Sequence, residues 1–244
     1  MRRVTTKPEL AEKQRQFNAA MELYNSRRGY KLFNTAVSVT NISLQLWLLS
    51  RIWPASIGAG GQAATLFIAW LLADFFNGLV HMLMDNNDRY DSTAGPLIAN
   101  FHLHHKIPRY TPHPLPMVYF VESGFKVWLA PCLAMIALLM QAGWLSPMLL
   151  HILVYIGILS SVAEVSHYLC HNSVSPLAMF LGNCRILLSK RHHAVHHIKD
   201  NVSYAFLNGL TDPLINLIAA KFFRGYKQNT DLHYATYAMD EVSR

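Results

Sequence analysis

Four long apolar segments constrain this chain more than any other feature of its sequence. They run over about residues 32–53, 62–84, 125–142 and 147–170. A helix that crosses a bilayer needs about 20 mostly apolar residues, so each segment is long enough or nearly so. A large soluble protein with buried helices is the alternative, but only 14% of the 244 residues are charged, too few to cover four such helices. We therefore predict an all-α integral-membrane bundle of about four transmembrane helices.

The charge distribution orients this bundle. Among the 21 Lys and Arg residues, only Arg51 lies near the connections 54–61 and 143–146. Basic residues mark the cytoplasmic side of a membrane protein, so both termini are expected there, in a bacterial inner membrane or the endoplasmic reticulum. Two weaker apolar stretches, 176–188 and 202–223, are expected to lie on or dip into that face. The net charge of +7 is then a topological signal, and it need not imply binding to nucleic acid.

Three parts follow from this division of the chain. A basic cytoplasmic segment covers residues 1–31, the membrane domain covers 32–225, and a C-terminal tail covers 226–244. A helix is expected at 8–27, either in a solvated tail or lying on the membrane surface.

The 13 histidines are not scattered. His151 and His233 stand apart and are expected to be bystanders. The remaining histidines fall in groups at His81, at His102 to His113, at His167 with His171, and at His192 to His197. Hydropathy alone defines the apolar segments, yet every histidine group lies on the predicted cytoplasmic side. The sequence therefore predicts a histidine-rich cytoplasmic cap.

The histidine spacing indicates metal binding. Residues i and i+4 share one helix face, and two imidazoles at this spacing can hold a metal ion. His167 with His171, and His192 with His196, are such pairs, and His193 with His197 form another, rotated about a quarter turn from the second. Eight nitrogen donors are too many for one ion that keeps an open site, but they suit two ions. The predicted metal ligands are His81, His104, His105, His167, His171, His192, His196 and His197.

Carboxylates and further histidines accompany the predicted ligands. Asp74, His81 and Asp85 share one helix face, and Glu164 precedes His167 by three residues. An acid within a membrane span is costly and usually marks a functional interior. We expect Asp74 to orient an imidazole, and for Glu164 both a ligand role and such an orienting role stay open. The residues expected around the ligands are Asp74, Asp85, Glu164, His102, His113 and His193.

The donor types narrow the metal and the chemistry. Imidazoles helped by carboxylates suit iron, zinc, copper or nickel. The three cysteines show no metal-ligand spacing, which argues against structural zinc and iron–sulfur sites. A paired site beside lipid tails suits oxidative attack on an unactivated C–H bond, provided that water is excluded.

These motifs carry a family resemblance. The H-x3-H and H-x3-H-H boxes are similar to those of integral-membrane desaturases and hydroxylases. More narrowly, residues 70–215 resemble the Kua-type lipid desaturase family, which is plasmanylethanolamine desaturase-like. The matching stretches are Ala-Asp-Phe-Phe-Asn-Gly-Leu-Val-His81 with Asp85, Asn-Phe-His-Leu-His104-His105, His167-x3-His171, His192-x3-His196-His197, and Tyr204 with Gly209.

The resemblance implies a lipid desaturase that binds two iron ions through the eight histidines and uses O2 as co-substrate. It further implies a membrane phospholipid substrate and an electron donor such as cytochrome b5 or a ferredoxin. The chain departs from the family pattern at Met82, at Lys106-Ile107-Pro108, in the spacing of His113 and Glu122, and at Gly209-Leu210. These departures concern the substrate rather than the metal core.

Two other functions stay open from the sequence. A lipid hydroxylase shares the first hydrogen abstraction with a desaturase. A metal transporter belongs to a different class, and its ligands would lie near the bilayer midplane rather than at one membrane face. Oligomeric state, chain length and double-bond position are not predicted.

Overall fold

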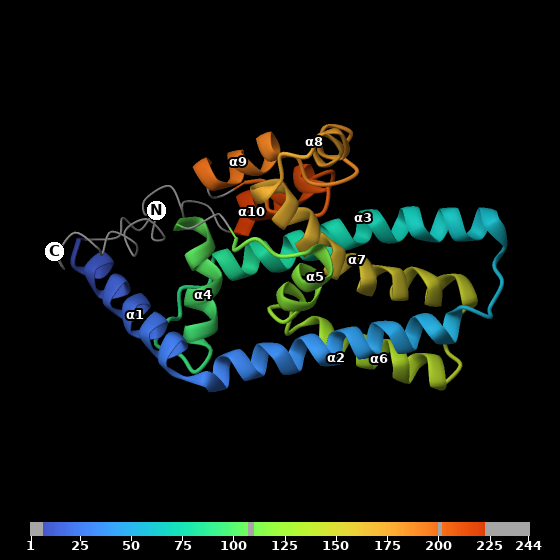
Figure 1. The fold of residues 1–244 in the computed structure, drawn as a ribbon, viewed down its shortest axis with the longest axis horizontal. Helices are drawn as coiled ribbons and strands as arrows, with labels where there is room; N and C mark the ends of the chain where they lie inside the picture. Colours follow the sequence, from blue (N-terminus) through green and yellow to red (C-terminus); the bar gives the residue numbers. More distant parts are fainter. Residues whose placement is uncertain (1–6, 107–109, 200–201, 223–244) are drawn as a thin grey trace.

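The computed structural model describes residues 7–106, 110–199 and 202–222, and within these ranges it contains ten helices and no strand (Figure 1). The helices are α1 (Lys7–Ser26), α2 (Arg28–Ile52), α3 (Gly58–Asp85), α4 (Gly95–Lys106), α5 (Leu115–Ser123), α6 (Leu129–Gln141), α7 (Pro147–Asn172), α8 (Pro176–Asn183), α9 (Lys190–Lys199) and α10 (Asp212–Phe222). The long helices lie side by side, and most of the short ones gather at one end (Figure 1). The all-α prediction is confirmed.

Three helices, α2, α3 and α7, are long and apolar enough to cross a membrane. They contain 25, 28 and 26 residues, so at about 1.5 Å per residue each exceeds the roughly 30 Å hydrocarbon core. In the most apolar stretch of each, only 33% of the residues are buried within the protein. The apolar side chains that remain exposed, such as Leu46 and Phe67, suit contact with lipid tails.

The expected spanning helix at 125–142 is shorter in the structure than the sequence predicts. The structure has α6 there, with 13 residues and a length of about 20 Å, too short to cross the core. The preceding α5 packs against α2 as α6 does, and the two are separated by residues 124–128. Among the described residues, three unbroken helices are therefore long and apolar enough to cross a membrane, and a fourth spanning helix is not confirmed.

The break between α5 and α6 is fixed by α2. A Cβ atom added at Gly124 would lie 2.5 Å from the carbonyl oxygen of Asn34, so only glycine permits this close approach. The side-chain Nδ2 of Asn41 donates hydrogen bonds to the carbonyl oxygens of Ser123 and Lys126, at 3.0 and 3.1 Å. Each of these carbonyl oxygens also accepts one backbone N–H three residues on, from Lys126 and from Leu129, so the α2 side chain adds a second hydrogen bond to both.

Helix α7 lies at the centre of the bundle and contacts α2, α3, α5 and α6. Small residues allow its close packing against α3, among them Ala69 and Ala73 on α3 and Ala163 on α7, all fully buried. Because α3 carries His81 at its end and α7 carries His167 and His171 at its end, this packing brings the predicted ligands together.

The N-terminal helix α1 packs against α4. Phe17 and Tyr90 meet edge to face, with ring centroids 5.3 Å apart, and Ile98 and Ala99 complete the cluster. Lys13 Nζ lies 3.4 Å from Asp88 Oδ2. The expected helix at 8–27 is therefore present and packs against α4, so the expectation of a solvated, partly disordered tail was wrong, whereas a position at the membrane surface stays a prediction.

The two weaker apolar stretches form helices only in part. Residues 176–183 form α8 and residues 212–222 form α10, whereas 202–211 form a loop. Leu177 and Phe180 on α8, and Leu217 and Phe222 on α10, are 60–70% exposed. Such apolar exposure fits helices that lie against a membrane surface.

Candidate metal centre

Nine side chains from four helices form two adjoining groups of metal-ligand atoms. In each group, one ligand atom per residue lies within 4.8 Å of all the others. The five-histidine group comprises His104, His167, His171, His193 and His197. The Asp85 group comprises His81, Asp85, His105 and His196.

In the five-histidine group, the imidazole Nε2 atoms converge. The Nε2 of His193 lies 2.8 Å from that of His167 and 3.0 Å from that of His197, and the Nε2 atoms of His167 and His171 are 3.2 Å apart. Two atoms bound at about 2.1 Å to one ion lie about 3.0 to 3.4 Å apart in octahedral or tetrahedral geometry. The observed spacing therefore fits a shared ion.

In the Asp85 group, three imidazoles surround one buried carboxylate. Asp85 Oδ2 lies 3.4 Å from Nε2 of both His81 and His196, and Asp85 Oδ1 lies 3.2 Å from Nε2 of His105. All four residues are buried. This spacing also fits coordination of one ion, with three nitrogen donors and one oxygen donor.

Helix geometry explains how each group forms. His167 with His171 on α7, His193 with His197 on α9, and His81 with Asp85 on α3 are all separated by four residues and share a face. Adjacent residues on a helix are rotated by about 100°. The doublets His104–His105 and His196–His197 therefore each place one imidazole in each group.

Backbone carbonyls set the orientation of two imidazoles in the Asp85 group. Nδ1 of His81 lies 2.6 Å from the carbonyl oxygen of Tyr204, and Nδ1 of His196 lies 2.9 Å from that of Val202. A carbonyl only accepts hydrogen bonds, so each Nδ1 carries the proton and each Nε2 keeps its lone pair. In the other group, Nδ1 of His167 lies 3.0 Å from the Tyr110 hydroxyl.

Burial keeps three of the donors on α4 and α9 neutral. Desolvation, reinforced by neighbouring histidines, lowers the pKa of His104 and His193 well below the ordinary value and that of His197 to about 3. Neutral imidazole is the form that binds metals. The Nε2 of His104 is buried with no hydrogen-bond partner among the described residues, as expected of an atom that would bind an ion. The donor set therefore fits two metal ions.

His192 and His193 differ from expectation in their placement. His193, expected beside the ligands, lies in the five-histidine group. His192, expected as a ligand, lies in neither group, and its Nε2 is 2.5 Å from Asp212 Oδ2. Asp212 also accepts the backbone N–H of Ala205 at 2.8 Å. His192 thus helps hold the 202–211 loop.

Asp74 holds the same loop rather than an imidazole. Its Oδ1 accepts the backbone N–H groups of Leu207, Asn208 and Gly209 at 2.9–3.2 Å, and its Oδ2 accepts the N–H and hydroxyl of Thr211 at 3.1 and 2.7 Å. Asp74 therefore affects the metal groups indirectly: it holds the loop whose carbonyl groups orient His81 and His196.

Three further residues expected near the ligands have other contacts. Glu164 pairs with Lys126, with Oε1 and Nζ 2.9 Å apart. His102 donates from Nε2 to the carbonyl oxygen of Met84 at 2.9 Å and accepts at Nδ1 from the Tyr90 hydroxyl at 2.7 Å. His113 has an exposed side chain and is in neither group.

His151 and His233 were expected to play no part in metal binding. His151 is buried in α7, with its Nδ1 2.7 Å from the carbonyl oxygen of Pro147 in its own helix. His233 lies outside the described residues.

Sequence reasoning missed two contributors to the site. Asp85 was expected beside the ligands, yet it sits at the centre of its group. Asp212 was not singled out, because it stands far from the histidine boxes in sequence and its position before Pro213 signals only the start of a helix.

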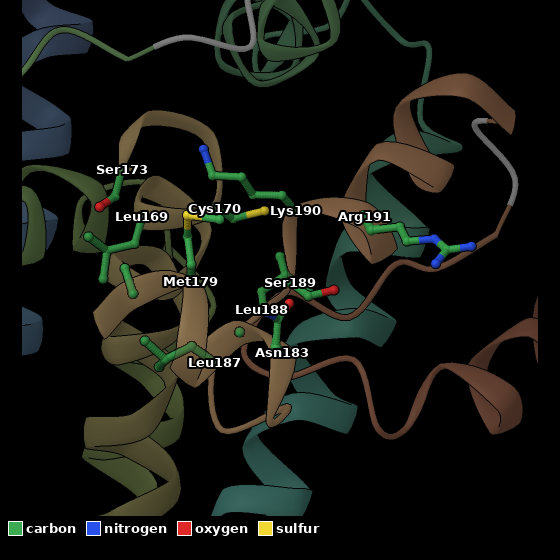
Figure 2. A pocket seen from close by; sticks show the side chains of 12 residues that line it. Leu169, Cys170, Ser173, Met179, Asn183, Leu187, Leu188, Ser189, Lys190 and Arg191 are labelled. Carbon is green, nitrogen blue, oxygen red and sulfur yellow. The ribbon is translucent and has the colours of Figure 1, made fainter. Parts of the chain in front are cut away.

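A pocket of about 160 Å³ has none of the grouped residues in its lining, and Figure 2 shows the side chains that form it. The C-terminal end of α7, α8 and the start of α9 form it, and its lining combines Leu169 and Leu187 with Ser173, Lys190 and Arg191. The pocket is therefore separate from the metal-ligand atoms.

Comparison with known proteins agrees with this arrangement. A family model described as the lipid desaturase domain matches residues 70–229, which contain all nine grouped residues. Neither a curated protein nor a solved structure matches the chain. Because the family model covers more than half of the sequence, the chain belongs to the lipid desaturase family.

Proposed function

We propose that this chain is an O2-dependent oxidoreductase that introduces a double bond into an alkyl or acyl chain of a membrane phospholipid, using two iron ions. One observation carries the proposal: two groups of buried nitrogen and oxygen donors adjoin each other at the end of apolar helices. Family membership supports lipid desaturation as the reaction class.

The proposed ligands follow the geometry of the two groups. His104, His167, His171, His193 and His197 would hold one ion, and His81, Asp85, His105 and His196 the other. This set keeps seven of the eight histidines expected from the sequence. It replaces His192 with His193 and adds Asp85.

Two iron ions bound here would supply the oxidising power that removes hydrogen from an unactivated chain, with O2 as oxidant. The chain's own residues orient the ligands and exclude water. The rings of Phe101, Tyr204 and Phe206 surround His81 with centroids 5.3–6.0 Å away and edge-to-face angles of 85–89°. A dry, aromatic wall protects a strong oxidant from quenching.

We propose that electrons come from a donor protein such as cytochrome b5 or a ferredoxin, as the family resemblance implies. We place the metal groups on the cytoplasmic face, together with most basic residues. This placement suits a soluble or peripheral donor on that side, in a bacterial inner membrane or the endoplasmic reticulum.

Lipid analysis tests the proposal. A host that expresses the wild-type chain should accumulate a phospholipid that is lighter by about 2 Da in one chain than in a host without the gene, and purified protein should contain about two irons. The variants His167→Ala and His196→Ala should abolish both signals, whereas His151→Ala should keep both.

Other outcomes separate the alternatives. A product heavier by about 16 Da would identify a hydroxylase. Metal accumulation in the host without any lipid change would favour a transporter and overturn the proposal.

A further inference from the structure

Lys126 is a buried cation inside the apolar helical domain. It lies in the break between α5 and α6, and it is only 3% exposed. Burying an ammonium group is costly, and a charged residue at such a place usually has a function. The break does not need this side chain, because Asn41 already satisfies the carbonyl oxygens of Ser123 and Lys126.

Two side chains hold the ammonium, and each lies about one helical turn from a proposed ligand. Nζ of Lys126 lies 2.9 Å from Oε1 of Glu164 on α7 and 2.5 Å from Oδ1 of Asn77 on α3. Glu164 is three residues before His167, and Asn77 is four residues before His81, so each partner is about one helical turn from a proposed ligand. Asn77 is fixed in turn, since its Nδ2 donates to Ala73 O at 2.6 Å and Ser160 Oγ at 2.9 Å.

The ring of Phe206 joins the ammonium to both groups. Nζ of Lys126 lies 4.5 Å from the centroid of this ring, within the range of a cation–π interaction. The same ring meets His81 of the Asp85 group at 5.3 Å and 89°, and His167 of the five-histidine group at 5.4 Å and 52°. Phe206 is thus in contact with one imidazole from each group.

We propose that Lys126 is a positioning residue for the metal pair: held by Glu164 and Asn77, it fixes the Phe206 ring against His81 and His167 and so sets the spacing of the two groups. The inference rests on the proposed function only in that the groups bind metal. Its chemistry is a desolvated cation–π contact supported by an ion pair, and Lys126 itself touches neither substrate nor metal.

The test compares four variants of the full chain, purified in detergent and loaded with iron-57 under argon: Lys126→Met, Lys126→Met with Glu164→Gln, Phe206→Leu, and the matched surface control Lys221→Met. Iron content, the Mössbauer spectrum and the thermal unfolding temperature are measured for each. The spectrum reports the environment of both ions, and a merely structural role would not change it.

Lys126→Met should lower the unfolding temperature, because Glu164 is left buried without its partner. It should also change the spectrum and weaken iron binding by about thirtyfold, the scale of a lost desolvated cation–π contact. The double variant should recover the unfolding temperature that is lost through the unpaired Glu164, but not the spectrum; Glu122, which also interacts electrostatically with Lys126, is the same in both variants. Phe206→Leu should change the spectrum in the same way, and Lys221→Met should match the wild type.

Two results would overturn the inference while leaving the proposed function intact. One is a double variant that restores the wild-type spectrum, because Lys126 would then serve only to neutralise Glu164. The other is a wild-type spectrum in Phe206→Leu. A wild-type chain that binds no iron would instead overturn the proposed function, and this inference with it.

Discussion

His104 and His105 are consecutive in α4, yet their imidazoles belong to different metal-ligand groups, with ring centroids 6.1 Å apart. His196 and His197 on α9 divide in the same way, with centroids 5.7 Å apart. In both α4 and α9, the rotation of about 100° between adjacent helical residues therefore sets the distance between the two groups.

This division predicts complementary losses of metal. His104→Ala should lose the ion of the five-histidine group and His105→Ala that of the Asp85 group, so each variant should retain about one iron where the wild type has about two. Their Mössbauer spectra should differ, because the ion that remains has five nitrogen donors in one case and three nitrogens with an oxygen in the other. Identical spectra for the two variants would contradict the assignment, and His151→Ala provides the control.

His192 and His193 should respond differently to the same substitution. His193→Ala should lower the iron content, because the Nε2 of His193 lies within 3.0 Å of those of His167 and His197. His192→Ala should keep the iron but lower the thermal unfolding temperature, because it removes the contact with Asp212. Iron loss confined to His192→Ala would restore the ligand set expected from sequence alone.

Asp74→Ala should destabilise the protein strongly. The carboxylate is fully buried and accepts hydrogen bonds from four backbone N–H groups and one hydroxyl of the 202–211 loop. Removing it leaves these donors unsatisfied, at a cost of about 3 kcal/mol in the free energy of unfolding. Asp88→Asn, which affects a partly exposed ion pair with Lys13, should cost less than about 1 kcal/mol. Equal unfolding temperatures for the two variants would refute the role given to Asp74.

Acid should destabilise the metal-free protein. Burial lowers the folded-state pKa of His197 to about 3 and those of His104 and His193 well below the ordinary value, whereas the unfolded chain takes up protons near the ordinary 6.5. The unfolded state therefore binds more protons between these values, and stability is full above about pH 6.5 and is lost as the pH falls toward 3. Unfolding temperatures between pH 7 and 5 measure this loss, and replacing all three histidines with glutamine should flatten the slope. A slope unchanged by that replacement would place the titrating groups elsewhere.

The sequence predicted where the long helices lie better than where a helix is broken. Hydropathy located α2, α3 and α7, because an apolar run of this length has few other uses. It did not reveal the break at residues 124–128, because that break depends on close contact between Gly124 and α2 and on a hydrogen-bonding side chain 82 residues away from Ser123. Such long-range partners leave no mark in local hydropathy.

The histidine boxes show the same limit on a finer scale. Spacing identified which helices carry ligands, but both His192 and His193 precede a histidine by four residues. A rotation of about 100° decides between them, and the packing of α9 against the rest of the protein fixes that rotation. Asp74 was also assigned the wrong partner. It was expected to orient an imidazole, whereas its carboxylate accepts hydrogen bonds from the backbone of a loop more than 130 residues later in the sequence.

The hydrogen bonds between Asp74 and the 202–211 loop join parts of the chain that are synthesised at different times. Asp74 and His81 are made in the first third of the chain, whereas their backbone partners are among the last described residues to be synthesised. A nascent chain that ends before Thr211 lacks two of these hydrogen bonds, even when every histidine of both groups has been translated. The hydrogen bonds that hold the 202–211 loop, and with it the carbonyl groups that orient His81 and His196, can therefore all form only after Thr211 has been synthesised.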